Sequence, residues 1–100
     1  MPTETSQPLQ AVDLSDATID DEFWTPRIET VRDETIDFVY DQLVSSGRIE
    51  NFRVAAGETD GEFQGRFYND SDVYKWLEGA CYFLETGDDP DLRACVSDLA

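Results

Sequence analysis

The chain has 100 residues, which fits one small domain or a piece of a larger one. Asp and Glu total 23 against 7 Lys and Arg, giving a formal net charge of -16, so we expect neither nucleic acid nor an anionic membrane as a partner. The 40% hydrophobic and 12% aromatic content is too high for a disordered chain. We therefore expect a folded, acidic protein.

The acidic side chains are mostly aspartate, and Lys75 is the only lysine. This balance resembles that of proteins from salt-loving archaea, whose cytoplasm is concentrated brine. At molar salt the Debye length falls to about 3 Å, so repulsion between carboxylates is screened. We interpret the protein as halophilic, with an ordinary acidic protein as the alternative.

The first ten residues, MPTETSQPLQ, lack the basic start and apolar core of a signal peptide, and no run approaches the roughly 20 apolar residues of a membrane span. We predict a soluble, cytoplasmic protein. Histidine is absent and Cys81 and Cys95 form no C-x-x-C pattern, so we expect no metal site within this segment. We interpret both cysteines as buried free thiols in helices rather than as a disulfide.

The N-terminal part offers little to pack. Residues 1–11 are predicted to be flexible, and AVDLSDATI then alternates weakly between apolar and polar residues, which indicates a short strand or an extended lead-in. We expect Phe23 and Trp24 to anchor this lead-in.

The first helix is predicted over residues 25–46. Thr25 is an N-cap residue type, Pro26 suits the first helical position, and Gly47 supplies a left-handed stop. Five apolar residues are expected on one side of this helix: Ile28, Val31, Ile36, Val39 and Leu43.

Residues 48–69 show no sustained helical or strand period, and glycine recurs every fourth residue at Gly57, Gly61 and Gly65. We predict a long, glycine-rich loop, a kind of segment that often carries function. A phosphate cradle is excluded, because no Lys-Ser/Thr pair follows and the intervening carboxylates would repel phosphate.

Two further helices follow. The first is predicted up to Gly87, with an apolar arc of roughly 180° that demands neighbours on more than one side; its members are Val73, Trp76, Leu77, Ala80, Cys81 and Leu84. The second starts with Asp89 as N-cap and Pro90 at the first position, and the short connection predicts an antiparallel hairpin. Its pattern has no stop signal before Ala100, so we interpret the chain as the N-terminal fragment of a longer helical protein.

The segment RFYNDSDVYKWLEGACYFLETG raises one question of chemistry. Asp70 and Asp72 could be the acid and base of a glycosidase, whose carboxyl groups stand about 5 to 9.5 Å apart. We favour helix capping by Asn69, Asp70 and Ser71, with Asp72 stabilised by the helix dipole and next to Lys75 at i+3. Trp76, Tyr74 and Phe67 could stack on a sugar, but Trp76 is predicted to lie in the core.

The run NFRVAAGETDGEFQGRFYNDSDVYKWLEGACYFL, residues 51–84, closely resembles the N-terminal region of glycoside hydrolase family 127, the β-L-arabinofuranosidases. DEFWTPRIETV resembles the opening segment of the same family, and DSDVYKWLE is the most specific part. The resemblance implies an all-α fold, the opening helices of an (α/α)6 barrel whose catalytic domain is followed by β-rich domains. We expect residues 12–100 to be the truncated N-terminal part of that domain.

The resemblance also implies a retaining mechanism with a zinc-bound cysteine nucleophile and a glutamate acid/base, all located beyond this segment. No catalytic or metal residue is therefore assigned here, and the segment alone is predicted to be inactive. Asp70 is the one expected substrate contact, at the pocket rim, with an L-arabinofuranoside or related carbohydrate as partner. Two alternatives remain open: an acidic helical protein-interaction module, or a hydrolase of the same fold acting on another glycoside.

Overall fold

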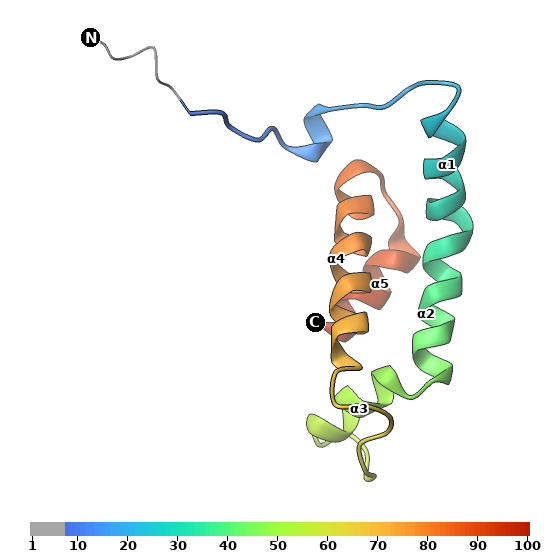
Figure 1. Cartoon of the computed structure of the whole chain (residues 1–100), viewed down its shortest axis with the longest axis vertical. Helices are drawn as coiled ribbons and strands as arrows, with labels where there is room; N and C mark the ends of the chain where they lie inside the picture. Colours follow the sequence, from blue (N-terminus) through green and yellow to red (C-terminus); the bar gives the residue numbers. More distant parts are fainter. Residues whose placement is uncertain (1–7) are drawn as a thin grey trace.

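The computed structural model describes residues 8–100, and all regular secondary structure in that range is helical, as predicted. A 3-10 turn η2 (Leu14–Asp16) precedes α1 (Trp24–Thr30), the π-helical segment η3 (Val31–Thr35), α2 (Ile36–Ser45), α3 (Arg48–Ala55), α4 (Asp70–Thr86) and α5 (Pro90–Leu99). Figure 1 shows α1, η3 and α2 as one long rod, with α4 beside it and α3 across one end. α5 folds back along α4, as the antiparallel hairpin prediction required.

The lead-in differs from the prediction in how it is held. It contains η2, which contacts α4, and the described part of the lead-in has no strand. Phe23 and Trp24 are 53% and 55% exposed, so they do not anchor it. Of the predicted flexible N-terminus, residues 8–11 are exposed and lack regular structure, and residues 1–7 lie outside the described range.

The first helix begins at Trp24, so the prediction of Thr25 as N-cap is wrong. The Asp21 carboxylate accepts hydrogen bonds from the main-chain N–H groups of Phe23 and Trp24, and it thereby satisfies donors at the start of the helix. The Thr25 hydroxyl accepts a hydrogen bond from the Asp21 N–H at 3.0 Å, so Asp21 and Thr25 are also linked in the reverse direction.

The π-helical segment explains how the apolar stripe of the long helix stays continuous. Val31 and Ile36 are five residues apart, and in an α-helix they would point about 140° apart. The Ile36 N–H instead bonds to the Val31 carbonyl, five residues back, which widens the turn and brings both side chains to the same side. Ile36 and Leu43 are buried, and Val31 packs against them.

Arg32, within η3, ties the rod to the end of α4. Its guanidinium donates to the Phe83 carbonyl at 3.1 Å and to the Thr86 hydroxyl at 2.9 Å, and its carbon lies 4.9 Å from the centre of the Phe83 ring. A cation in the last turn of a helix is favoured by the helix dipole. Gly87 ends α4 and leaves room for this contact, because a Cβ there would lie 2.8 Å from the guanidinium.

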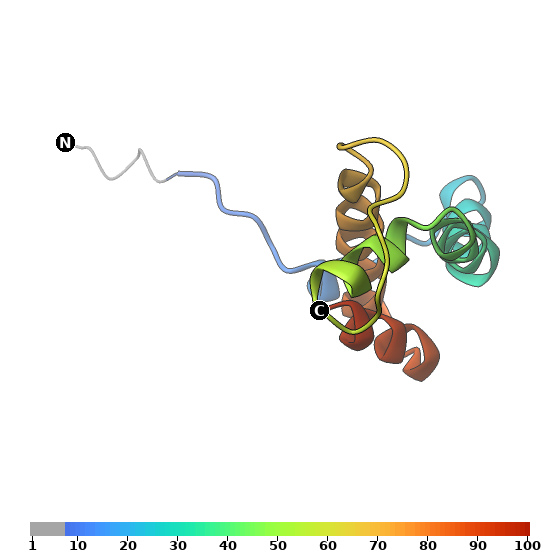
Figure 2. The ribbon, with the colours of Figure 1, turned by 90° about the horizontal axis from the view of Figure 1, so that it is seen from below.

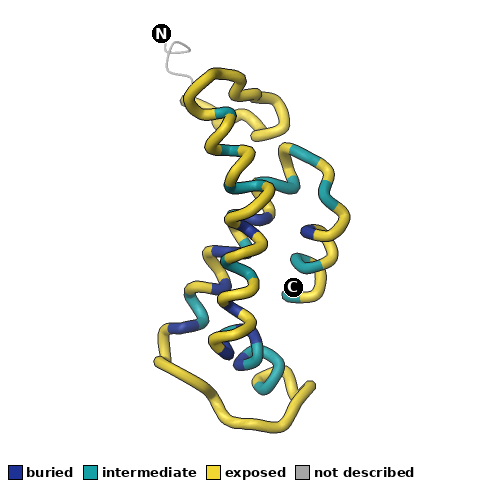
Figure 3. The backbone as a smooth tube through the Cα atoms, turned by 90° about the vertical axis from the view of Figure 1, so that its right-hand side faces the viewer, coloured by how far each residue is buried: buried dark blue, intermediate teal, exposed yellow. Residues whose placement is uncertain are grey.

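The core lies between α2, α3, α4 and α5, and Figure 3 marks the buried positions along the tube in dark blue. It comprises Ile36, Leu43, Ile49, Val73, Trp76, Ala80 and Leu92. Trp76 is 8% exposed, its indole N–H donates to the Ile36 carbonyl at 3.0 Å, and its ring centre lies 5.0 Å from that of Tyr40. The prediction of Trp76 as a core residue is confirmed.

Helix α3 corrects the predicted loop over residues 48–69. Gly47, at φ 82, ends α2, and its carbonyl accepts from the Asn51 N–H at 3.0 Å, so the chain re-enters a helix at once. Ile49 is buried and Phe52 packs against the core. These two apolar contacts are too few to produce a visible period in the sequence, and the loop is confined to residues 56–69.

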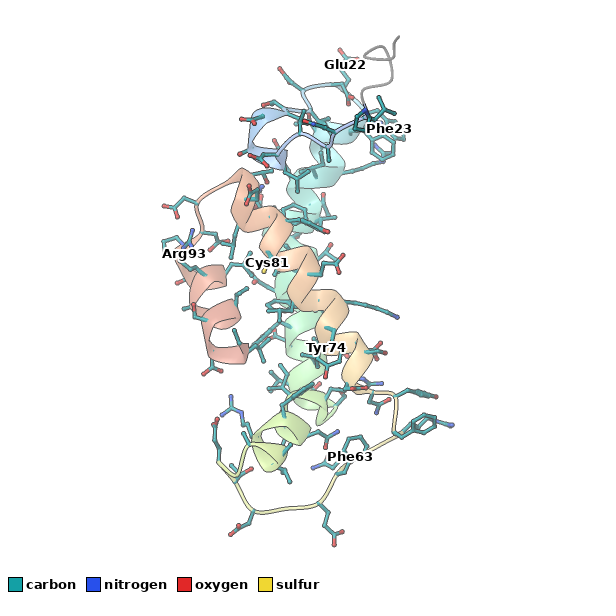
Figure 4. The ribbon with its side chains drawn as sticks, turned by 90° about the vertical axis from the view of Figure 1, so that its left-hand side faces the viewer. Glu22, Phe23, Phe63, Tyr74, Cys81 and Arg93 are labelled. Atoms are coloured by element: carbon teal, nitrogen blue, oxygen red, sulfur yellow. The ribbon has the colours of Figure 1, made fainter. Side chains whose placement is uncertain are left out.

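The α4–α5 corner matches its prediction. The Asp89 carboxylate accepts from the Leu92 N–H at 3.1 Å, and Pro90 occupies the first position of α5. The buried-thiol interpretation is half wrong, because Cys95 is half-buried but Cys81 is exposed. Figure 4 looks onto the side of α4 turned away from α2, and Tyr74 and Cys81 lie on it. Both side chains are exposed.

Candidate functional site

The candidate site lies where α3, the 56–69 loop and the start of α4 meet, at the end of the molecule seen from below in Figure 2. The loop is fixed there by Asn51, which is 8% exposed. Its side-chain NH₂ donates to the Gln64 carbonyl at 2.8 Å, and its side-chain oxygen accepts from the Gln64 N–H at 2.8 Å. Because both polar ends of the buried amide are satisfied by one residue, the second half of the loop is held against α3.

The loop then turns into α4 beside a second buried amide. Gly65 has φ +84, and a Cβ on it would collide with the amide nitrogen of Asn69, which is also 8% exposed. A side chain at this position would be strained by its dihedral angle and blocked by its neighbour. Glycine therefore lets the loop pass close to Asn69 and delivers Asp70 to the start of α4.

Helix α4 starts without the predicted side-chain cap. Asn69 is the residue before the helix, but its side chain accepts no capping hydrogen bond. The first N–H groups are bonded by the preceding turn instead, with Ser71 N–H to the Tyr68 carbonyl at 3.2 Å and Asp72 N–H to the Asn69 carbonyl at 3.3 Å. The predicted cap position is confirmed at Asn69, with Asp70 and Asp72 in the first turn, but the predicted side-chain hydrogen bond is wrong, since a tight turn already satisfies the donors that it would serve.

Asp72 pairs with Arg48 rather than with Lys75. The Arg48 Nε lies 2.9 Å from a carboxylate oxygen of Asp72, and both side chains are partly exposed. The pair joins α3 to α4 and lines a depression of about 460 Å³ that also includes Trp76. The Asp72 carboxylate is thus engaged in an ion pair that connects α3 and α4.

Asp70 faces a different hollow. It is half-buried and lines a pocket of about 210 Å³ with Asn51, Phe52, Ala55, Phe63 and Phe67. No hydrogen bond or ion pair reaches its carboxylate from residues 8–100. Because Asp70 and Asp72 line separate hollows, they are not arranged as an acid and base across one sugar.

Aromatic rings surround the Asp70 pocket. Phe67 is 91% exposed and forms an edge-to-face pair with Tyr68, with ring centres 5.3 Å apart, and Phe52 pairs similarly with Tyr74 at 5.6 Å. Figure 4 shows Phe63 on the loop, below the end of α4 that carries Tyr74. Of the aromatic candidates from the sequence, Phe67 and Tyr74 lie near this pocket and Trp76 does not. Asn51 and Phe63 were missed, because their roles depend on α3.

Comparison with known proteins gives the family. The profile of the family described as beta-L-arabinofuranosidase, GH127 catalytic domain, matches residues 16–99. The chain belongs to this family. A curated relative, the non-reducing end beta-L-arabinofuranosidase of Bifidobacterium longum subsp. longum, is 55% identical over 49 residues, which are 49% of this chain and 7% of the relative. The chain therefore corresponds to a small part of that relative's length, and its all-helical structure agrees with the opening helices of a GH127 catalytic domain.

This GH127 segment does not by itself assemble a metal site. No three Cys, Asp or Glu side chains among residues 8–100 are grouped so that they could hold a metal ion. Burial is the main cause that raises the pKa of the Cys95 thiol, with the Asp37 charge adding to it, and burial likewise raises the pKa of Tyr40. None of the described helices of this GH127 chain is long and apolar enough to cross a membrane.

Proposed function

We propose that this chain is the N-terminal segment of a retaining glycoside hydrolase that cleaves β-L-arabinofuranosides, and that residues 12–100 open its catalytic domain. The family match over residues 16–99 carries this proposal. The 55% identity to a curated β-L-arabinofuranosidase, although limited to 49 residues, supports the same substrate class. In this proposal the segment builds helices and one wall of the sugar site.

We place the bond-breaking groups of the proposed enzyme, a zinc-bound cysteine nucleophile and a glutamate acid/base, beyond this segment. No three Cys, Asp or Glu side chains within residues 8–100 are grouped as metal ligands, which supports that placement. Bound zinc would keep a coordinating thiol deprotonated at neutral pH.

In the same proposal, Asp70 binds the substrate. Its carboxylate is unpaired within the described residues and lies in a pocket at the start of α4. Sugar hydroxyl groups would donate hydrogen bonds to it, and bonds to an ionised acceptor are about twice as strong as neutral ones. Asn51 and the Arg48–Asp72 pair would hold the loop and the helix that position this carboxylate.

The test measures release of L-arabinose from an aryl β-L-arabinofuranoside by the full-length protein, in low and molar salt, with and without a zinc chelator. We expect molar salt to favour turnover, because the chain has the acidic and nearly lysine-free composition of a halophilic cytoplasmic protein. We expect the chelator to abolish turnover. Release of no L-arabinose contradicts the proposed activity. Turnover that survives the chelator contradicts the zinc-bound nucleophile.

The substitution Asp70→Asn keeps the shape of the side chain and removes its charge. We expect the KM for a β-L-arabinofuranosyl disaccharide to rise about tenfold, corresponding to about 1.4 kcal/mol. Asp88→Asn, on the exposed connection between α4 and α5, serves as the matched control and is expected to leave KM unchanged. Equal KM values for the two variants would remove Asp70 from the binding site.

A second candidate function, an acidic helical module that binds a partner protein, draws on the exposed aromatic residues of α2 and α4. Phe38, Tyr74 and Tyr82 are 63%, 53% and 52% exposed. A self-sufficient module would unfold cooperatively as 100 residues in low salt, whereas the opening of a catalytic domain would not. Circular dichroism melting of the 100-residue chain in low and molar salt separates the two. A panel of other glycosides tests the remaining alternative, a related hydrolase with a different sugar.

A further inference from the structure

The pocket at the start of α4 combines aromatic walls with one carboxylate, which suits a neutral sugar. Its walls are mainly the side chains of Phe52, Phe63 and Phe67, and Asp70 supplies the only charged side chain in its lining. Aromatic rings offer flat apolar area to the C–H face of a sugar. A carboxylate at the edge of such rings accepts hydrogen bonds from the hydroxyl groups that surround that face.

The size of the pocket matches one sugar unit. Its volume is about 210 Å³. Pockets for drug-sized ligands begin at about 300 Å³, so the pocket accommodates a single ring, while the rest of a longer substrate would lie outside it.

The charge of the pocket rejects acidic ligands. Asp70 would repel a phosphate or a uronic acid, and the chain as a whole carries a net charge of -16. The remaining lining groups are apolar apart from Asn51, whose amide is occupied by the main chain of Gln64. Among sugars, these charges exclude acidic ones and favour neutral ones.

The pocket is preformed on one side. The Asn51–Gln64 hydrogen bonds hold the chain next to Phe63, and Gly65, at φ +84, sets the turn that precedes Phe67. The main chain that carries Phe63 and Phe67 is thus positioned before any ligand arrives. Phe67 is 91% exposed, which leaves its ring available.

We propose that the pocket formed by Phe52, Phe63, Phe67 and Asp70 is a subsite for a second, uncleaved neutral sugar unit of the substrate. This inference rests on the proposed arabinofuranosidase function and adds a determinant of substrate length to it. The ring of that sugar stacks on Phe67 and Phe63, and its hydroxyl groups donate to the Asp70 carboxylate. The main rival occupant, a helix from elsewhere in the same polypeptide, would need only apolar contact and no flat ring at residue 67.

The experiment uses the full-length protein with two substrates, a β-L-arabinofuranosyl disaccharide and the one-sugar methyl β-L-arabinofuranoside. The measured quantity is the ratio of their KM values. Phe67→Leu keeps an apolar side chain but removes the flat ring, and Phe67→Trp keeps a flat ring. We expect Phe67→Leu to raise the disaccharide KM relative to the methyl glycoside KM about two- to tenfold, the usual range for one aromatic contact.

Two comparisons complete the design. Phe67→Trp is expected to keep the KM ratio within about twofold of wild type, because the stacking surface remains. Phe38→Leu, a matched loss of an exposed ring on α2, is expected to leave the ratio unchanged. If the KM ratio of Phe67→Leu equals that of wild type, the subsite is overturned. If the melting temperature of this variant also falls, Phe67 is assigned to packing against another helix.

Failure of the proposed function is distinguished by the wild-type protein alone. If it hydrolyses neither substrate, calorimetric titration with the same disaccharide decides the inference. Binding that Phe67→Leu weakens and Phe67→Trp retains supports a sugar subsite without arabinofuranosidase activity. Absence of heat from binding overturns the subsite.

Discussion

Trp76 provides the sharpest test of how this segment is held together. The indole is 8% exposed, packs on Tyr40, and donates to the Ile36 carbonyl at 3.0 Å. Trp76→Phe removes the pyrrole part of the ring, equivalent to two or three buried methylene groups and about 2 kcal/mol. The lost hydrogen bond adds about 1 kcal/mol. We therefore expect the free energy of unfolding to fall by about 3 kcal/mol.

Urea unfolding of the full-length protein measures this change as a shift of the catalytic-domain transition, followed by far-ultraviolet circular dichroism so that the readout does not rely on tryptophan fluorescence. Trp24→Phe is the matched control, because Trp24 is 55% exposed and its side chain accepts or donates no hydrogen bond within the described residues. A surface change of this kind costs less than about 0.5 kcal/mol. If Trp76→Phe lowers the free energy of unfolding no more than Trp24→Phe does, then Trp76 is not a core residue, and the sugar-stacking role that its core position excludes becomes open again.

Three further changes test other parts of the structure. Asn51→Ala should lower the free energy of unfolding by about 2 kcal/mol, since two buried hydrogen bonds are lost, and should speed proteolysis of the loop it holds; unchanged cleavage would contradict its role. Asp89→Ala should cost about 1 kcal/mol in urea unfolding through loss of the α5 cap, whereas Asp88→Ala should cost less than about 0.5 kcal/mol. Burial raises the pKa of Cys95 and Tyr40 above their ordinary values of 9.0 and 10.0, so both groups ionise first in the unfolded state as the pH rises. The contribution of these two groups to the free energy of unfolding is therefore complete below pH 9 and is lost as the pH rises through the raised pKa values. Melting temperatures across that range should fall less in the Cys95→Ala, Tyr40→Phe double variant than in wild type, and parallel curves would contradict this linkage.

The features that could be predicted from the sequence are those encoded by neighbouring residues. Asp89 and Pro90 mark the start of α5 because the cap and the first turn are only a few residues apart. Gly47 marks the end of α2 because its left-handed conformation is a property of that residue alone. The 3.6-residue period placed Trp76 in the core, and the family was identified from the DSDVYKWLE segment.

The features that could not be predicted depend on contacts between distant segments. Helix α3 is stabilised by burial of Ile49 and by Asn51, which bonds to Gln64 in the following loop. Asp72 was assigned to Lys75 by helical spacing, but Arg48 approaches it from α3. Both errors arose because the side chain on the other element was unknown.

The same reasoning applies to Cys81. Its position on the apolar arc of α4 indicated burial, but burial depends on what packs against each part of the arc. The described helices cover the turns that carry Val73, Trp76 and Ala80, while Cys81 stays accessible. A periodic pattern therefore identifies the apolar side of a helix without locating the neighbour that covers it.

The widened turn of η3 also bears on how this long helix tolerates changes in length. Its Ile36 N–H to Val31 carbonyl bond accommodates one residue more than a regular turn would hold. Deleting Glu34 would close the turn to ordinary geometry and keep Ile28 and Leu43 in phase, whereas the same deletion within α2 would rotate everything after it by about 100°. Relatives that lack one residue at this point would thus be expected to retain the same packing, and an alignment gap here would mark a harmless change of helical pitch.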